Sequence, residues 1–210
     1  MKLFRSAAIF GLFLMLFCIL GQNSAFAASK TDTLVNNAIK AGKTLTNVTT
    51  VEKKANGKSI PTKEYNAAVK AYKSAKSAVN KQSAKQKKTN LSKLKTVNTQ
   101  ITRGKKYIDA VTYGKKIAQK KATLDKYVKT GSTKEMLNTY SSLLSDIKKY
   151  SPKFDAVYGK KTRDTIKKLY KTPADKIIKD LNYPVTVKKS INETTKLIKE
   201  SASSSKLAAQ

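Results

Sequence analysis

The chain has 210 residues, of which 44 are lysine or arginine and 13 aspartate or glutamate, and its formal net charge is +31. It has no histidine and a single cysteine at position 18, a composition that excludes Ser-His-Asp triads and zinc sites built from His and Cys. Carboxylate chemistry remains, but the acids are scattered singly among lysines, so we expect no enzyme, no metal and no cofactor.

Residues 1–27 have the pattern of a secretory signal peptide. Lys2 and Arg5 precede an apolar run from Ala7 to Leu20, and Ala25-Phe26-Ala27 supplies an A-x-A cleavage site. The run is shorter than the roughly 18 to 20 apolar residues that a membrane span needs, and no second run follows. The pattern predicts an exported protein without a transmembrane anchor.

Cys18 raises the question of a lipid anchor. The residue before it is the bulky Phe17, whereas a lipoprotein cleavage site takes a small residue there. We therefore interpret Cys18 as part of the removed signal. Loss of the signal also removes Lys2 and Arg5 and lowers the formal net charge by two, from +31 to +29.

The remaining chain is predicted to be all-α, with two or more consecutive three-helix bundles that share long helices. The N-terminal bundle spans residues 28–103, and its apolar residues recur every three or four positions, which puts them on one helix face. They are Leu34, Ala38, Ala41, Leu45, Val48 and Val51 in the first helix, Tyr65, Ala68, Tyr72, Ala75 and Val79 in the second, and Leu91, Leu94, Val97 and Ile101 in the third.

The connections of this bundle follow from turn residues. Asn56 to Pro61 is a turn by composition, and Thr62 is expected to cap the second helix. A lysine-rich, looser connection is expected from Asn80 to Thr89.

A second helical region is expected over residues 104–200. The third helix should run through Gly104 and Gly114, although each glycine costs about 1 kcal/mol relative to alanine and Gly104 is the expected weak point. Thr130-Gly131 predicts its end, and Ser132-Thr133-Lys134-Glu135 predicts a capping box that opens the next helix.

Three prolines are expected to divide the rest. Ser151-Pro152 and Thr172-Pro173 each place a capping residue before proline, which is typical of a helix start. Pro184 predicts a break, followed by a final helix with Val187, Ile191, Thr194 and Ile198 and a flexible tail over residues 201–210.

The least generic stretch runs from Val157 to Asp164 and combines an aromatic residue, a glycine, two lysines and an arginine. An aromatic face beside cations suits sugars and polyanions. The alternative is that Val157, Tyr158, Ile166 and Leu169 form one apolar helix face among solvated charges.

The net charge favours a polyanionic partner. Among the cations of the exported chain only Arg103 and Arg163 are arginines, which argues against specific reading of nucleic-acid bases. An anionic wall polymer is the favoured partner. A secreted protein that binds nucleic acid without specificity, and an accessory structural protein that contacts other wall proteins, remain alternatives.

Two motifs resemble a known family. Tyr107-Ile108-Asp109-Ala110 with Tyr113, and Asp155-Ala156-Val157-Tyr158-Gly159-Lys160-Lys161-Thr162-Arg163-Asp164, are similar to the N-terminal wall-anchoring region of SbsC-type S-layer proteins, over residues 101–188. The resemblance implies a non-catalytic region of triple-helical bundles that binds the anionic secondary cell wall polymer of a Gram-positive envelope. It also implies a secreted, cell-wall-associated protein.

The candidate polymer-binding residues are basic or aromatic and form two groups. Asp164 is interpreted as a partner of Arg163 or a nearby lysine and not as an acid catalyst. One group comprises Arg103, Lys105, Lys106, Tyr107 and Tyr113, and the other Lys149, Tyr150, Lys153, Tyr158, Lys160, Lys161, Arg163, Lys167 and Lys168.

Overall fold

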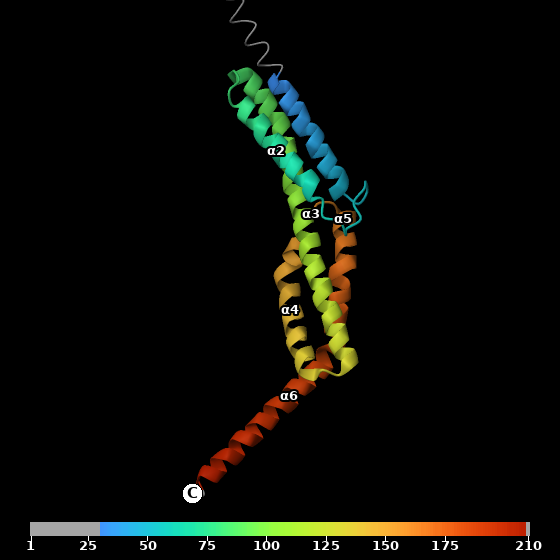
Figure 1. The fold of residues 1–210 in the computed structure, drawn as a ribbon, viewed down its shortest axis with the longest axis vertical. Coiled ribbons are helices and arrows are strands. Elements are labelled where there is room, and N and C mark those ends of the chain that lie inside the picture. Colours follow the sequence, from blue (N-terminus) through green and yellow to red (C-terminus); the bar gives the residue numbers. More distant parts are fainter. Residues whose placement is uncertain (1–29, 209–210) are drawn as a thin grey trace, which may run out of the picture. The chain divides into compact units, whose positions relative to one another are not determined.

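A computed structural model describes the backbone of residues 30–208 and the side chains through residue 202. The predicted signal peptide, with Cys18, lies outside the described residues. The all-α prediction is confirmed, and none of the described helices has the length and apolar character of a membrane span. The elements are a helix over residues 30–49, α2 (Thr62–Val79), α3 (Ala84–Thr130), α4 (Thr133–Asp155), α5 (Lys160–Ile166), the π-helix η1 (Lys167–Lys171) and α6 (Thr172–Ala208) (Figure 1).

The described chain forms two compact units that divide within α3, between Ile108 and Asp109. The first unit holds the described residues through Ala55 together with Ser59–Ile108, and the second holds Asn56–Lys58 and the residues from Asp109 onward. The expected boundary lay a few residues earlier, between residues 103 and 104.

The core of the first unit comes from the helix at residues 30–49, α2 and the first half of α3. About half of the expected stripe is buried and the rest is partly buried. Val35, which was not expected in the stripe, is 1% exposed, whereas the expected Leu34 is only partly buried. Tyr65 and Tyr72 pack at the edge of this core. Its buried members are Val35, Ala38, Leu45, Ala68, Ala75, Val79, Leu94, Val97 and Ile101.

Two expected features of the first unit are wrong. Pro61, not Thr62, is the N-cap of α2, and no side chain caps the helix. The loose connection is also shorter than expected, because α3 already begins at Ala84. Asn90 explains the early start: it is buried, and its side-chain amide donates hydrogen bonds to Asp32 Oδ1 (3.1 Å) and Gln82 Oε1 (3.0 Å), which hold the first turns of α3 in place.

The α3 helix runs unbroken through both glycines, as predicted. Gly104 was expected to weaken the helix, but it allows a close contact: a Cβ atom there would lie 2.7 Å from Leu45 Cδ2. In the second unit, a Cβ atom on Gly114 would lie 2.5 Å from Cδ2 of Tyr170. Both glycines therefore let a large side chain pack directly on the backbone of α3.

The turn from α3 to α4 is partly as predicted. Gly131 has a φ of +69°, the left-handed conformation expected at the end of α3, and α4 begins at Thr133. The capping box is wrong: Ser132 occupies the N-cap position without a side-chain capping bond, and its hydroxyl pairs with that of Thr130 at 3.1 Å.

The predictions for Pro152 and Pro184 are wrong because both lie inside a helix, whereas α6 begins at Thr172, as predicted for Pro173. Pro152 is inside α4, where the buried Phe154 anchors the last turn, and Pro184 is inside α6 next to the buried Val185. Pro173 lies in the first turn of α6, directly after η1. A proline ring clashes with the carbonyl four residues earlier, here that of Leu169, and the wider π-helix at that position makes room for the ring.

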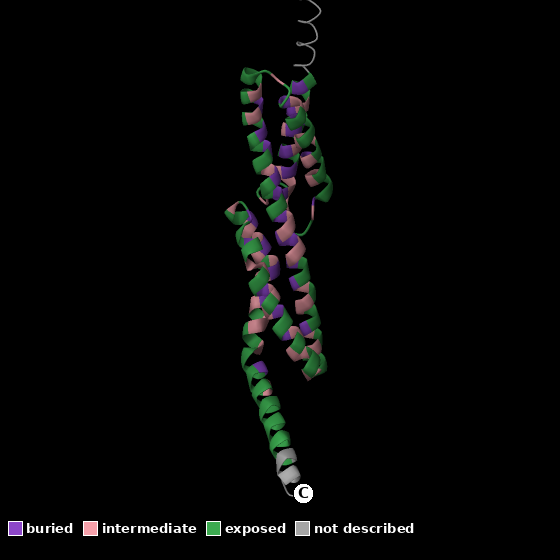
Figure 2. Ribbon diagram, turned by 90° about the vertical axis from the view of Figure 1, so that its left-hand side faces the viewer, coloured by how far each residue is buried: buried purple, intermediate pink, exposed green. Residues whose placement is uncertain are grey.

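The C-terminal part of α6 is mostly exposed (Figure 2). This part of α6 includes the expected stripe of Val187, Ile191, Thr194 and Ile198. The stripe is not buried, since Ile191 is 51% and Ile198 64% exposed. Helical backbone continues to Ala208, where a flexible tail was predicted, and residues 209–210 lie outside the described chain.

The contact at Gly104 predicts the effect of a single methyl group. Gly104→Ala should lower the free energy of unfolding in urea by about 1 to 3 kcal/mol, because overpacking against Leu45 outweighs the gain in helix propensity. Leu45→Ala should make room for the methyl, so the double variant should lose less than the two single variants together. The exposed Ser92→Ala on α3 is the control, and a Gly104→Ala variant as stable as the wild type would contradict the prediction.

Pro184 predicts a gain of local order. Pro184→Ala restores one backbone N–H and removes the ring from the helix interior, where proline is about 3 kcal/mol less favourable than alanine. Amide hydrogens of the neighbouring α6 turns should therefore exchange at least tenfold more slowly. Ser190→Ala on the same helix should leave exchange nearly unchanged, and unaltered exchange in Pro184→Ala would rule out strain at this residue.

Candidate functional site

Two tyrosines from different helices stack in the second unit. Tyr113 of α3 and Tyr150 of α4 have ring centroids 4.2 Å apart and ring planes 14° from parallel. Both side chains are half-buried, so each contributes to the α3–α4 packing while part of the pair stays in contact with solvent. Aromatic pairs of this kind add about 0.5 to 1.5 kcal/mol beyond the area that they bury.

A lysine lies beside each ring of this stack. Lys116 Nζ is 5.6 Å from the ring centroid of Tyr113, and Lys149 Nζ is 5.5 Å from that of Tyr150. A cation within about 6 Å of a ring face is attracted by about 0.5 to 1 kcal/mol at an exposed site. Within the described chain neither lysine forms an ion pair. We call Tyr113, Lys116, Lys149 and Tyr150 the tyrosine–lysine cluster.

The cluster joins the two groups of candidates that the sequence had kept apart. Tyr113 belonged to one group and Lys149 and Tyr150 to the other, but the pairing of α3 with α4 stacks the two tyrosines. Lys116 was not among the candidates. Its position three residues after Tyr113 on one helix puts the two side chains on the same face, a signal that was present in the sequence.

Tyr107 is wrong as a binding residue, because it is 0% exposed. It lies four residues before the buried Val111 and three after Gly104, on the face of α3 that packs into the core. Its neighbours Arg103, Lys105 and Lys106 are exposed and belong to the first unit.

The stretch from Val157 to Asp164 forms a tight turn that opens α5. Val157 and Thr162 are buried, and Gly159, with φ +82°, takes a conformation that favours glycine. Arg163 Nη1 donates a hydrogen bond to the Val157 carbonyl at 3.2 Å, so the guanidinium holds the turn.

Some charged side chains on and next to this turn form ion pairs with each other. Lys160 Nζ pairs with Asp164 Oδ2 at 2.7 Å, and this hydrogen bond lowers the pKa of the Asp164 carboxyl, which fits the expected role as a lysine partner. Lys167 pairs with Asp155 at 2.5 Å. Tyr158 is 55% exposed and so does not join Val157 in the core. The apolar-face interpretation therefore holds for Val157 and the buried Ile166 and fails for Tyr158.

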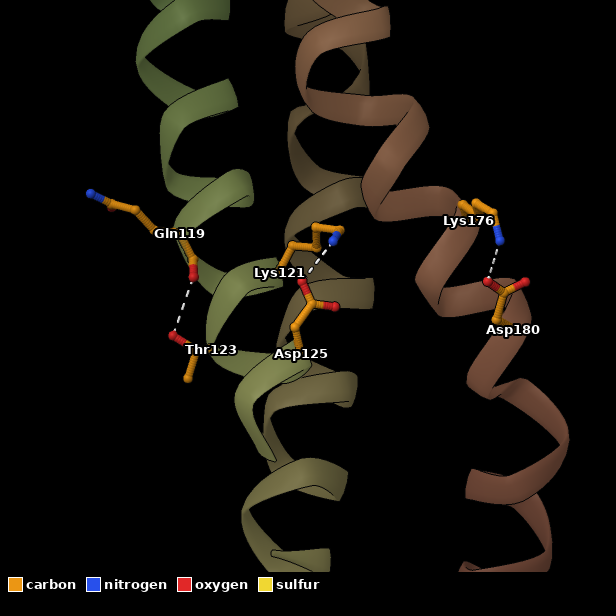
Figure 3. Close-up of polar contacts among 6 residues, drawn as sticks. All are labelled: Gln119, Lys121, Thr123, Asp125, Lys176 and Asp180. Carbon is orange, nitrogen blue, oxygen red and sulfur yellow. Dashed lines mark hydrogen bonds and ion pairs between the residues drawn. The ribbon is translucent and has the colours of Figure 1, made fainter. Parts of the chain in front are cut away.

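Most acids of the second unit form ion pairs with lysines. Figure 3 shows two such pairs one helical turn apart, Lys121 with Asp125 (2.6 Å) and Lys176 with Asp180 (2.7 Å). No three acids in the described residues come together as a metal site would require. By contrast, the candidates Lys149, Lys153, Lys161 and Lys168 are exposed and form no ion pair within the described chain.

Three solved structures resemble this fold. They are the crystal structure of the S-layer protein rSbsC(31-844), the structure of surface layer protein SbsC, domains 1-6, and the crystal structure of the N-terminal part of the bacterial S-layer protein SbsC. Each superposes with a TM-score of 0.70 at 24% sequence identity over 80% of this chain. The chain spans only 26%, 26% and 44% of their lengths, respectively. No curated protein matches the chain.

A family profile also matches. The profile described as the SbsC C-terminal domain aligns with residues 46–175, more than half of the chain. The match includes the tyrosine–lysine cluster and the turn at Val157 to Asp164, and it extends through α2, which lies outside the residues of the sequence resemblance. The chain therefore belongs to the SbsC C-terminal domain family.

Proposed function

We propose that this is an exported, non-catalytic, cell-wall-associated protein that binds an anionic secondary cell wall polymer through lysine, arginine and tyrosine side chains. The observation that carries the proposal is the tyrosine–lysine cluster, where stacked rings and two lysines without ion pairs share one surface. The family membership supports it, since the solved structures of similar fold are those of S-layer proteins.

The chemistry of the cluster suits a charged glycan. The exposed part of an aromatic ring packs against the C–H face of a sugar, while a lysine ammonium meets a carboxylate or a phosphate. Lys161, Lys153 and Lys168 add exposed ammonium groups elsewhere in the second unit. One exposed ion pair contributes little, but many along one polymer bind tightly because each raises the effective concentration of the next.

Specific recognition of nucleic acid is disfavoured, so the competing partner is nucleic acid bound without specificity through its phosphates. Reading of bases depends on arginine forks, and in the second unit Arg163 already donates to the Val157 carbonyl. Two measurements separate the two partners. One is retention on sacculi before and after removal of the accessory polymer, and the other is DNA binding at physiological salt. Loss of retention on stripping with weak DNA binding supports the polymer, and equal binding to all three would show unspecific attraction.

The two lysines of the cluster give the first prediction on binding. Lys116→Gln with Lys149→Gln should weaken retention on native sacculi about tenfold at low salt, since two favourable ionic contacts are lost. Lys93→Gln with Lys95→Gln removes the same charge from exposed positions of α3 in the first unit and should have a much smaller effect. An equal loss in both pairs would show that net charge alone governs retention.

The tyrosine stack gives a second prediction. Tyr150→Ala removes the ring that packs on Tyr113 and should weaken retention several-fold and lower the free energy of unfolding by about 1 kcal/mol or more. Tyr150→Phe keeps the ring and should retain most of both properties. If Tyr150→Ala lost stability but bound sacculi like the wild type, the stack would be structural only.

A further inference from the structure

An open groove runs between α3 and α4 in the second unit, beside the tyrosine–lysine cluster, and residues with polar side chains line it. Gln119, Lys120 and Thr123 line it from α3, and Asn138, Thr139 and Ser142 from α4. Its volume is about 580 Å³, within the roughly 300 to 1,000 Å³ of small-molecule sites. Lys116 also lines the groove and belongs to the cluster, so the two surfaces are continuous.

Apart from Lys116, which belongs to the cluster, the charges in the groove are compensated. Lys120 Nζ, from α3, forms an ion pair with Asp146 of α4 and also donates to Ser142 Oγ at 2.8 Å. Both partners of the ion pair are largely shielded, with side chains 29% and 21% exposed. The Asp146 carboxylate neutralises Lys120, so this part of the groove, unlike the end at Lys116, offers no uncompensated cation to the anionic groups of a polymer.

Apart from Lys116, the other polar side chains that line the groove are neutral amides and hydroxyls. The side-chain amides of Gln119 and Asn138 make no hydrogen bond with the described part of the chain. The Thr123 hydroxyl donates to the backbone carbonyl of Gln119 at 3.2 Å, and the lone pairs of the hydroxyl oxygen remain as acceptors (Figure 3). Phosphate and carboxylate oxygens only accept, whereas sugar hydroxyls and amides do both, which matches this set of groups.

We propose that the groove is a subsite for a neutral sugar unit of the wall polymer. The inference rests on the proposed function and adds a division of labour: the tyrosine–lysine cluster meets the anionic group, and the groove meets the uncharged sugar next to it. Neutral hydrogen bonds are screened far less by salt than ion pairs are. The groove therefore supplies the part of the binding that survives high salt.

The test removes neutral groups and leaves the charge unchanged. Gln119→Ala with Asn138→Ala takes one exposed amide from each wall, and alanine is the best helix former, so the fold is retained. Asn66→Ala with Asn98→Ala removes two exposed amides in the first unit as the matched control. Retention on native sacculi is measured from low salt to about 0.5 M, where the Debye length falls to a few ångströms.

We expect the groove variant to bind about tenfold more weakly than the wild type at low and at high salt alike, because salt does not screen the lost hydrogen bonds, with the control unchanged at both. Wild-type retention that survives high salt but is equal in the groove variant overturns the subsite and leaves the proposed function intact. Wild-type retention that vanishes at high salt also overturns the subsite. No wild-type retention at any salt overturns the proposed function together with the subsite.

Discussion

The structure depends on one apolar stripe along α3. Leu94, Val97 and Ile101 pack into the core of the first unit, while Ile117 and Leu124 are fully buried in the second. A helix in water gains most of its stability by burying such a face, so α3 needs both sets of neighbours to remain helical over its 47 residues. The two glycines let Leu45 and Tyr170 pack against its backbone in their respective units.

The packing of α3 against α4 creates the candidate site. α4 packs its buried residues, among them Tyr140, Leu143 and Ile147, toward the interior of the second unit. Tyr150 lies three residues beyond Ile147, at the border between the buried and exposed faces, where it meets Tyr113. A residue at such a border packs with part of its surface and offers the rest to solvent. The stack thus owes its rigidity to the core and its accessibility to its position at the rim.

The helical fold and much of the core could be predicted from the sequence, because a three- or four-residue apolar repeat has one geometric meaning. Leu45, Ala68 and Leu94 were all placed correctly in this way. The helical conformation at Pro152 and Pro184 could not be predicted, since local preference favours a helix end at a proline. Burial of the neighbouring Phe154 and Val185 overrides that preference. Burial by neighbours distant in sequence is invisible to local rules.

The candidate site was harder to predict for the same reason. Tyr107 and Tyr113 lie on one helix and look alike in sequence, but one is in the core and the other at the rim. The contact between Tyr113 and Tyr150 needs the register of α3 against α4, which periodicity does not supply. Lys116 was within reach of sequence reasoning through its spacing from Tyr113, whereas the groove with Asn138 needed both helices in place.

The lysine-rich surface makes salt act in two opposite directions. Acids such as Asp125 and Asp180 are paired within a helical turn, so the excess positive charge rests on lysines that repel one another. Dissolved ions relieve that repulsion and favour the compact chain, while they weaken attraction to a polyanion. A salt wash that detaches the protein from a wall would thus release it folded and ready to attach again after dilution.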